Sequence, residues 1–231
     1  MRVAAVVLAG GSGTRVGADR NKVYLTIAGR SIISWSLRTM AALPAVTRLV
    51  LVIRPADREL VGPLLATELP GVDVELVDGG AQRQDSELQA LRHLAPEITA
   101  GDIDIVAIHD GARPLATAEL MNQVLDAAAR YGGAVPGLPA SGLVATGDNG
   151  VATPLSGRHV GVQTPQAFAA VPLLAAYEAA ARDDYSATDT AGCMQRYSSV
   201  EVRCVPGGVD NLKVTTPADL VLAESLLGQR R

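Results

Sequence analysis

Short apolar runs alternate with amphipathic segments along most of the chain. Runs rich in valine, isoleucine and leucine are typical of buried strands, and they predict strands at residues 3–8, 48–53, 72–77, 103–108, 134–138 and 200–205. Apolar side chains at helical spacing predict helices at about residues 31–42, 57–68, 117–131, 171–182, 188–196 and from 216 onward. Because strands and helices alternate, the pattern predicts an α/β fold: a single three-layer α/β/α domain, residues 1–231, with a mostly parallel, Rossmann-like sheet.

The segment 139–161 departs from this alternation. Its residues are mostly small, polar or glycine, and Asp148-Asn149-Gly150 is a strong signal for a hairpin turn. We therefore predict a β-arm that projects from the domain, and we expect this arm to pair with a second subunit in a homodimer. The sequence contains no internal repeat, linker or low-complexity tract, which favours one domain with an arm.

The first apolar run ends in a glycine-rich segment, Ala9-Gly10-Gly11-Ser12-Gly13, and two cations, Arg15 and Lys22, follow it. Glycines let successive backbone N–H groups approach an anion, and nearby cations complete its neutralisation. The spacing fits neither a dinucleotide-binding fingerprint nor a P-loop. An ordinary strand-to-helix turn would explain the glycines but not the two cations, so the segment predicts a phosphate-binding loop.

A second glycine loop, Gly79-Gly80, follows the strand predicted at 72–77, and Arg83 and Ser86 come directly after it. We expect Asp85 or Ser86 to cap a helix that ends near residue 94. The carboxyl ends of parallel strands meet at one edge of a sheet, so Arg83 and Ser86 can face the same ligand as the first loop. A capped helix with a surface arginine explains this stretch equally well.

The segment His109-Asp110-Gly111-Ala112-Arg113-Pro114 follows the strand predicted at 103–108. A carboxylate at the end of a buried strand suits Mg²⁺, which takes one or two carboxylates together with substrate oxygens. An Asx-turn or a helix cap would also use Asp110, but the adjacent glycine and arginine favour the metal. His109 has no second histidine at metal-binding spacing, so we interpret it as structural.

The chain contains only two lysines, Lys22 and Lys213, and its other basic side chains are arginines and histidines. A lysine ammonium is a compact, strongly hydrated point charge, unlike the planar guanidinium of arginine. Chance is the alternative explanation. However, Lys22 follows the first glycine loop and Lys213 lies in the polar segment 210–215 after a predicted strand, which favours a function for both.

Composition narrows the class of protein. A net charge of −4 and an aromatic content of 3% argue against nucleic acids or membrane surfaces as partners. Cys193 and Cys204 lack a C-x-x-C spacing, so we expect structural thiols rather than a disulfide or a metal site. We find neither a signal peptide pattern nor the run of ~20 apolar residues that a membrane span requires. We therefore expect a cytoplasmic protein.

Five ordered motifs together resemble a known family. They are residues 8–15 with Lys22, then Gly79-Gly80 with Arg83 and Ser86, then residues 109–114, Gln163-Thr164-Pro165-Gln166, and Asn211-Leu212-Lys213-Val214-Thr215. The first is similar to the signature of nucleotide-sugar-type nucleotidyltransferases. All five together look like the 2-C-methyl-D-erythritol 4-phosphate cytidylyltransferase family of the non-mevalonate isoprenoid pathway. The similarity extends from Val3 to the final helix.

The resemblance implies a CTP-dependent cytidylyltransferase that forms a homodimer, requires Mg²⁺ and releases pyrophosphate. It assigns catalysis at the α-phosphate of CTP to Arg15, Lys22 and Lys213, and the metal to Asp110. It assigns nucleotide binding to Ala9, Gly10, Gly11, Ser12, Gly13, Gly80, Arg83 and Ser86. Binding of the acceptor, a polyol phosphate, falls to Arg113, Arg158, Thr164 and Thr188.

The sequence departs from the family pattern mainly on the acceptor side. Ser141-Gly142 replaces an expected Asp-Thr pair, Ser156 replaces an arginine with Arg158 two positions away, and Asp189-Thr190 replaces an acidic pair. Beside the first lysine the chain has Asn21 and Val23. Three alternatives therefore stay open: another acceptor such as ribitol 5-phosphate, another nucleotide such as GTP or UTP, and a non-catalytic nucleotide-binding module.

Overall fold

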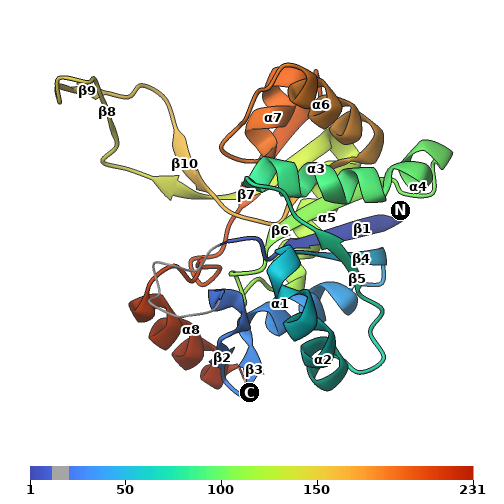
Figure 1. The fold of residues 1–231 in the computed structure, drawn as a ribbon. Helices are drawn as coiled ribbons and strands as arrows, with labels where there is room; N and C mark the ends of the chain where they lie inside the picture. The colour runs from blue at the N-terminus through green and yellow to red at the C-terminus, as the bar shows by residue number, and fades with distance from the viewer. Residues whose placement is uncertain (12–20, 231) are drawn as a thin grey trace.

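A mixed, mostly parallel sheet runs through the middle of the molecule in the computed structural model, which describes residues 1–11 and 21–230 (Figure 1). In this part of the chain the strand order is β10-β7-β11-β6-β1-β4-β5, and β12 pairs with β7 outside that path. The strands are β1 (Val3–Leu8), β4 (Val46–Ile53), β5 (Glu75–Asp78), β6 (Ile105–Asp110), β7 (Gly132–Ala140), β10 (His159–Val162), β11 (Gln166–Ala169) and β12 (Glu201–Pro206).

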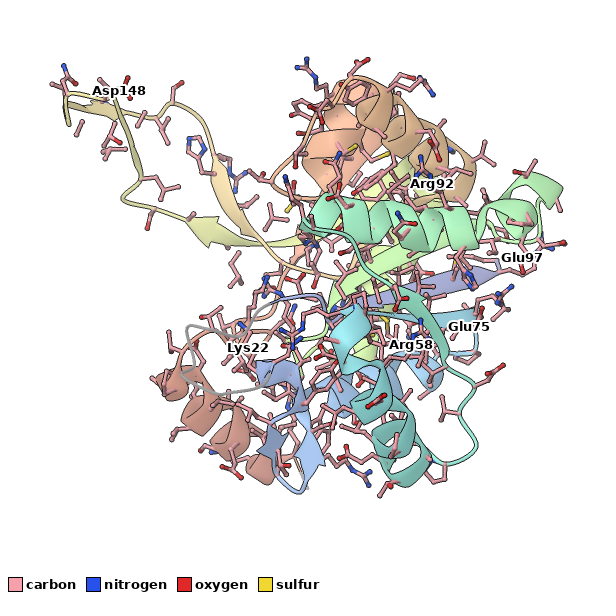
Figure 2. All side chains as sticks on the ribbon, in the orientation of Figure 1. Lys22, Arg58, Glu75, Arg92, Glu97 and Asp148 are labelled. Atoms are coloured by element: carbon pink, nitrogen blue, oxygen red, sulfur yellow. The ribbon has the colours of Figure 1, made fainter. Side chains whose placement is uncertain are left out.

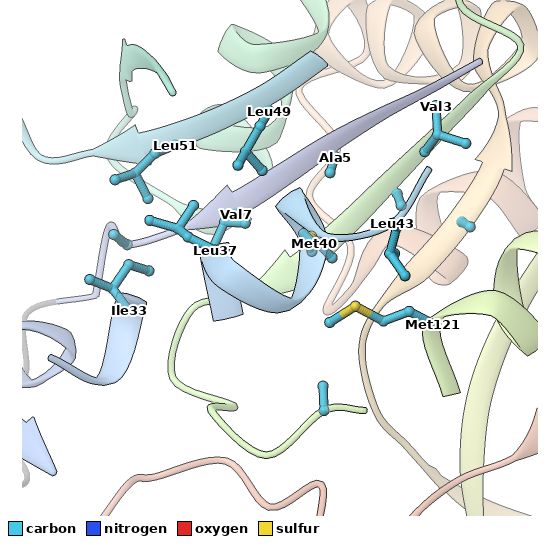
Figure 3. Packing of buried hydrophobic residues seen from close by; sticks show 14 of the residues in the cluster. Val3, Ala5, Val7, Ile33, Leu37, Met40, Leu43, Leu49, Leu51 and Met121 are labelled. Carbon is cyan, nitrogen blue, oxygen red and sulfur yellow. The ribbon is translucent and has the colours of Figure 1, made fainter. Parts of the chain in front are cut away.

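Helices cover both faces of this sheet. Successive strand residues point to opposite faces, so Val3, Ala5 and Val7 join one hydrophobic cluster while Ala4 and Val6 join another. The first cluster, part of which Figure 3 shows, also contains side chains of α1 (Ile32–Ala41), α2 (Arg58–Glu68) and α5 (Ala118–Tyr131). The second contains side chains of α3 (Arg83–His93), α4 (Ala95–Ala100), α6 (Ala170–Arg182) and α7 (Thr190–Tyr197). The predicted three-layer α/β/α fold is therefore confirmed.

Smaller elements complete the fold. A 3-10 turn, η2 (Lys22–Tyr24), leads into the short strands β2 (Thr26–Ile27) and β3 (Arg30–Ser31), and η3 (Pro55–Asp57) precedes α2. The last helix, α8 (Pro217–Gln229), packs Ala223 and Leu227 against Ile27, Ile32 and Val214 in a third cluster. None of the helices in residues 1–11 and 21–230 combines the length and apolar character needed to cross a membrane.

Several elements were not predicted from the sequence, among them strands β2 and β3, where a turn was expected, strand β11 and helix α4. Strand β11 lies between β6 and β7 and is antiparallel to both. Its four residues, Gln-Ala-Phe-Ala, include no β-branched side chain, so tertiary pairing rather than local preference decides their conformation. Helix α4 follows α3 directly, after Leu94. Of the predicted strands, 3–8 has the bounds expected, whereas 103–108 is shifted to Ile105–Asp110. Cys193 and Cys204 are both free thiols; Cys193 is buried, as a structural thiol would be, whereas Cys204 is exposed.

The predicted hairpin is present and stands away from the rest of the molecule (Figure 1). Beyond the paired ends of β7 and β10, the strands β8 (Val144–Thr146) and β9 (Ala152–Pro154) form a two-stranded antiparallel sheet. Their turn is closed by the Gly150 N–H, which donates to the Gly147 carbonyl at 2.9 Å. Asp148 marks the end of the hairpin in Figure 2. We call residues 141–158 the arm.

Candidate active site

The parallel strands β1, β4 and β6 end at the same edge of the sheet, where Leu8 is in register with Val52 and Asp110. The loops that leave this edge are bonded to neighbouring strands. The Ala9 N–H donates to Val52 (2.8 Å), and the Gly111 N–H donates to Leu8 (3.0 Å). A cavity of about 440 Å³ lies there. The sequence-predicted residues that line it are Ala9, Gly10, Gly11, Lys22, Gly80, Arg83, Ser86, Asp110 and Lys213.

The two glycine loops meet over Ser86. Its hydroxyl accepts a hydrogen bond from the Gly80 N–H (3.1 Å) and donates one to the Gln82 carbonyl (3.0 Å). A Cβ added to Gly10 would lie 3.5 Å from the same hydroxyl oxygen. The expectation that Asp85 or Ser86 caps α3 holds for Asp85. The N-cap residue is Gln82, and Asp85, at the third helical position, accepts the Gln82 N–H (3.0 Å) in a capping box.

Lys22 is held close to the end of β1 by its neighbour Asn21. The Asn21 amide donates to the Ala9 carbonyl and accepts from the Val23 N–H (3.3 Å), and its side chain is buried. The segment that carries Lys22 therefore has a defined position beside the first glycine loop. The sequence singled out Asn21 only as a departure from a pattern. Ser12, Gly13 and Arg15 lie outside the described residues.

Three cationic side chains lie around the carboxylate of Asp110. Lys213 Nζ lies 2.9 Å from Oδ2, Arg113 Nε lies 3.5 Å from Oδ2, and Arg83 Nη2 lies 3.3 Å from Oδ1. The Asp110 side chain is only 10% exposed. Burial alone would raise the pKa of Asp110, but Lys213 and the arginines together hold it well below its usual range. This carboxylate is therefore ionised at neutral pH.

The loop that carries Lys213 is anchored independently of its ammonium group. The Val214 N–H donates to the Ala112 carbonyl (2.8 Å), and Arg113 Nη1 donates to the Asn211 carbonyl (2.7 Å). The buried amide of Asn211 donates to the Thr164 carbonyl (2.9 Å). Hydrogen bonds thus join three of the sequence motifs behind the cavity: residues 109–114, 163–166 and 211–215.

His109 and Thr164 support Asp110 from the core. The Arg113 carbonyl is an acceptor, so the proton of His109 is on Nε2, which donates to it (3.3 Å). His109 Nδ1 then accepts from the Thr164 hydroxyl (3.1 Å), which itself accepts the Asp110 N–H (3.0 Å). Burial lowers the pKa of His109 to about 4, which keeps the ring neutral. These contacts fit the structural interpretation of His109.

The four residues predicted to bind the acceptor are not brought together by one chain. Thr164 is buried and its hydroxyl is used by His109 and Asp110. Arg113 reaches Asp110 and the Asn211 carbonyl. Arg158 and Thr188 are exposed, and neither is among the described residues that line the cavity. Arg158 belongs to the arm, which stands away from the body of the molecule (Figure 1).

Comparisons with known proteins agree with this geometry. The model of the 2-C-methyl-D-erythritol 4-phosphate cytidylyltransferase (IspD) family matches residues 3–229. A 2-C-methyl-D-erythritol 4-phosphate cytidylyltransferase of Pelotomaculum thermopropionicum is 39% identical, and the alignment covers 100% of this chain and 96% of that protein. The chain belongs to this family.

Solved structures of the cytidylyltransferase family share the fold. The crystal structure of the 2-C-methyl-D-erythritol 4-phosphate cytidylyltransferase of Thermus thermophilus has a TM-score of 0.72 at 31% identity, over 98% of each chain. The 4-diphosphocytidyl-2C-methyl-D-erythritol synthase of Anaerococcus prevotii has a TM-score of 0.84 at 25% identity, again over 98% of each chain.

The donor set at Asp110 fits the magnesium predicted from the likeness to the cytidylyltransferase family. Within residues 1–11 and 21–230, no group of three or more histidine, cysteine, aspartate or glutamate side chains is placed to hold a metal ion. Mg²⁺, however, is commonly held by one or two carboxylates, with water and substrate phosphates as its other ligands. Asp110 is one ionised carboxylate that lines the cavity, and it suits that arrangement.

One buried residue of the site escaped the sequence analysis. Glu87 is 1% exposed and lies behind Arg83, with Oε1 2.6 Å from Arg83 Nη1. Burial raises the pKa of Glu87, although the ion pair with Arg83 opposes this. The spacing of four residues between Arg83 and Glu87 is typical of an ion pair on one helix face. That signal indicates a pair, but it carries no information on which pairs are buried.

Proposed function

We propose that this enzyme transfers the cytidylyl group of CTP to 2-C-methyl-D-erythritol 4-phosphate and releases pyrophosphate. The observation that carries the proposal is the convergence of Lys22, Lys213 and Asp110 with two glycine loops on one cavity. Two glycine loops offer backbone N–H groups, and two ammonium groups offer positive charge, so the cavity suits a polyphosphate. Membership of the cytidylyltransferase family supports the nucleotide and the reaction.

In the proposed reaction an oxygen of the acceptor phosphate attacks the α-phosphorus of CTP. The new P–O bond forms in line with the bond to pyrophosphate, which breaks. The acceptor phosphate is already ionised at neutral pH, so no strong general base is required. The chain must supply positioning and stabilisation of the charge that develops at phosphorus.

We assign these roles to particular residues of the cavity. The glycine loops, with Gly80 and Ser86, bind the nucleotide, and Lys22 and Lys213 bind its phosphates. We assign Arg15 to the same phosphates from its place in the sequence. Asp110 would hold Mg²⁺, which when bound supplies positive charge that neutralises the phosphate oxygens. Lys213, paired with Asp110 at 2.9 Å, lies where it would contact phosphates held by a cation at that carboxylate.

We further propose that a second copy of the chain completes the acceptor site through its arm. The arm exposes four large apolar side chains, Leu143, Val144, Val151 and Leu155, which are 42–56% accessible. Such a cluster on a projecting hairpin suits burial against another subunit. Arg158 lies at the base of this arm and does not line the cavity of its own chain. In a dimer, the arm of one subunit would instead bring its Arg158 to the acceptor bound in the other subunit.

An acceptor panel tests the proposed function. Pyrophosphate release is measured with each of the four nucleoside triphosphates and with 2-C-methyl-D-erythritol 4-phosphate, ribitol 5-phosphate and glycerol 3-phosphate. We expect strict preference for CTP with methylerythritol phosphate, and loss of turnover when EDTA removes Mg²⁺. Preference for ribitol 5-phosphate would instead indicate that the altered arm recognises another polyol phosphate. Absence of turnover with every acceptor, together with CTP binding, would indicate a nucleotide-binding module.

A further inference from the structure

Glu87 is a buried carboxylate that the proposed reaction leaves unused. It lies on α3, one turn beyond Arg83 and outside the cavity lining among the described residues, and it contacts three side chains from three helices. The Tyr177 hydroxyl, from α6, donates to Oε2, and the Thr190 hydroxyl, from α7, donates to Oε1 at 3.0 Å. Arg83 Nη1 lies 2.6 Å from Oε1. A carboxylate only accepts hydrogen bonds, so the two hydroxyls are suitable donors, and the arginine adds an ion pair.

Arg83 connects this buried carboxylate to the cavity. One end of its guanidinium pairs with Glu87, and the other end, Nη2, lies 3.3 Å from Asp110 Oδ1. Asp110 in turn pairs with Lys213 through its second oxygen. Charges of alternating sign therefore extend from the core to the cavity in the order Glu87, Arg83, Asp110, Lys213.

These contacts determine which cation faces each oxygen of Asp110. Arg83 shares its charge between two carboxylates, and Glu87 is fixed by hydroxyls from α6 and α7. The negative charge of Glu87 keeps Arg83 on Oδ1, and Oδ2 faces Lys213 and Arg113. Without the charge of Glu87, the guanidinium has Asp110 as its remaining carboxylate partner, and it competes with Lys213 for the same group.

We propose that Glu87 is a positioning residue that holds Arg83 on Oδ1 of Asp110 and so keeps Oδ2 available to Lys213, the ammonium group assigned to the phosphates of the nucleotide. This inference rests on the proposed function, because it assigns Asp110 and Lys213 to the CTP site. Residues that orient catalytic or metal-binding groups without touching the substrate commonly contribute about 10- to 100-fold in affinity or activity.

The test compares Glu87→Gln with Tyr177→Phe. Glutamine keeps the size of Glu87 and one of its two accepting oxygens, but it removes the charge that holds Arg83. Tyr177→Phe removes the hydrogen bond to Oε2 of the same carboxylate and leaves the pair between Oε1 and Arg83 in place. A residue that merely stabilised the core would give both variants a lower melting temperature and the same kinetic constants as wild type.

We expect Glu87→Gln to weaken CTP binding in the presence of Mg²⁺, and to lower kcat/KM for CTP, by about 10- to 100-fold. We expect KM for the acceptor to be unchanged and Tyr177→Phe to retain wild-type kinetics. Binding is measured by titration calorimetry, in which the stoichiometry reports the folded fraction, so a destabilised variant still gives the Kd of its folded molecules.

Two results would overturn the inference: a wild-type Kd and kcat/KM in Glu87→Gln, or equal losses in Glu87→Gln and Tyr177→Phe. Failure of the proposed function looks different. In that case the wild-type protein itself shows no turnover with CTP and any acceptor, while the calorimetric comparison of the two variants still reports whether Glu87 acts through Arg83 on the nucleotide.

Discussion

Lys213 offers the sharpest test of the proposed mechanism, because its removal should affect the reaction and not the fold. Its side chain is 40% exposed at the cavity, and its Nζ lies 2.9 Å from Asp110 Oδ2. Asp110 keeps Arg83 and Arg113 when the ammonium is removed. The loop itself is held by backbone bonds, including the 2.8 Å bond from Val214 to Ala112. The variant is Lys213→Ala.

The expected magnitude follows from this geometry. A partly exposed ion pair contributes at most about 1 kcal/mol to folding, which corresponds to a shift of about 2–4 °C in melting temperature for a chain of this size. Loss of one preorganised donor to the developing charge at phosphorus typically lowers kcat by about 10²–10³. Lys213→Ala should therefore retain its fold and lose nearly all turnover.

The assay is steady-state pyrophosphate release with saturating CTP and acceptor, together with a melting curve for each variant. Lys22→Ala should show a loss of the same order. The control is Arg92→Ala, which removes an equal charge from an exposed pair between α3 and α6, with Glu178 at 2.7 Å. Arg92 lies far from Lys22 (Figure 2). Wild-type kcat in both lysine variants, with all melting curves alike, would refute the assignment.

Two further predictions concern stability and assembly. Burial lowers the pKa of His109 from 6.5 to about 4. Between these pH values the unfolded chain binds more protons at His109 than the folded chain does, so the free energy of unfolding rises with pH and this contribution is complete above pH 6.5. We expect it to fall by about 3 kcal/mol as the pH drops to 4. Denaturant unfolding of His109→Gln should show a smaller loss over this range, and an equal loss would contradict the reasoning. In sedimentation experiments, Val144→Asp on the arm should convert a homodimer to monomer, whereas Val171→Asp, on an exposed face of α6, should not; a monomeric wild-type protein would rule out the proposed dimer.

Much of the candidate site could be predicted because its parts are local. The glycine loops, Asp110 and Lys22 each follow or adjoin a predicted strand, and parallel strands bring their carboxyl ends to one edge. The acceptor residues could not be placed in this way. Arg158 lies on the arm and Thr188 on an exposed loop, so their positions depend on contacts beyond the sheet edge. Glu87 was missed because a sequence shows a helical ion pair without showing that helices bury it.

The sequence by itself determined the elements that depend on neighbouring residues. The strand Val3–Leu8 follows from its apolar run, and the start of α8 follows from Thr216 and Asp219, whose side chains cap that helix. Tertiary structure alone decided the antiparallel position of β11, the pairing of Lys213 with Asp110, and the burial of Glu87 beneath Arg83. The physical reason is the separation along the sequence of the groups that interact. Caps and apolar periodicity act within a few residues, whereas strand order and buried charge pairs depend on segments that meet only when the chain is folded.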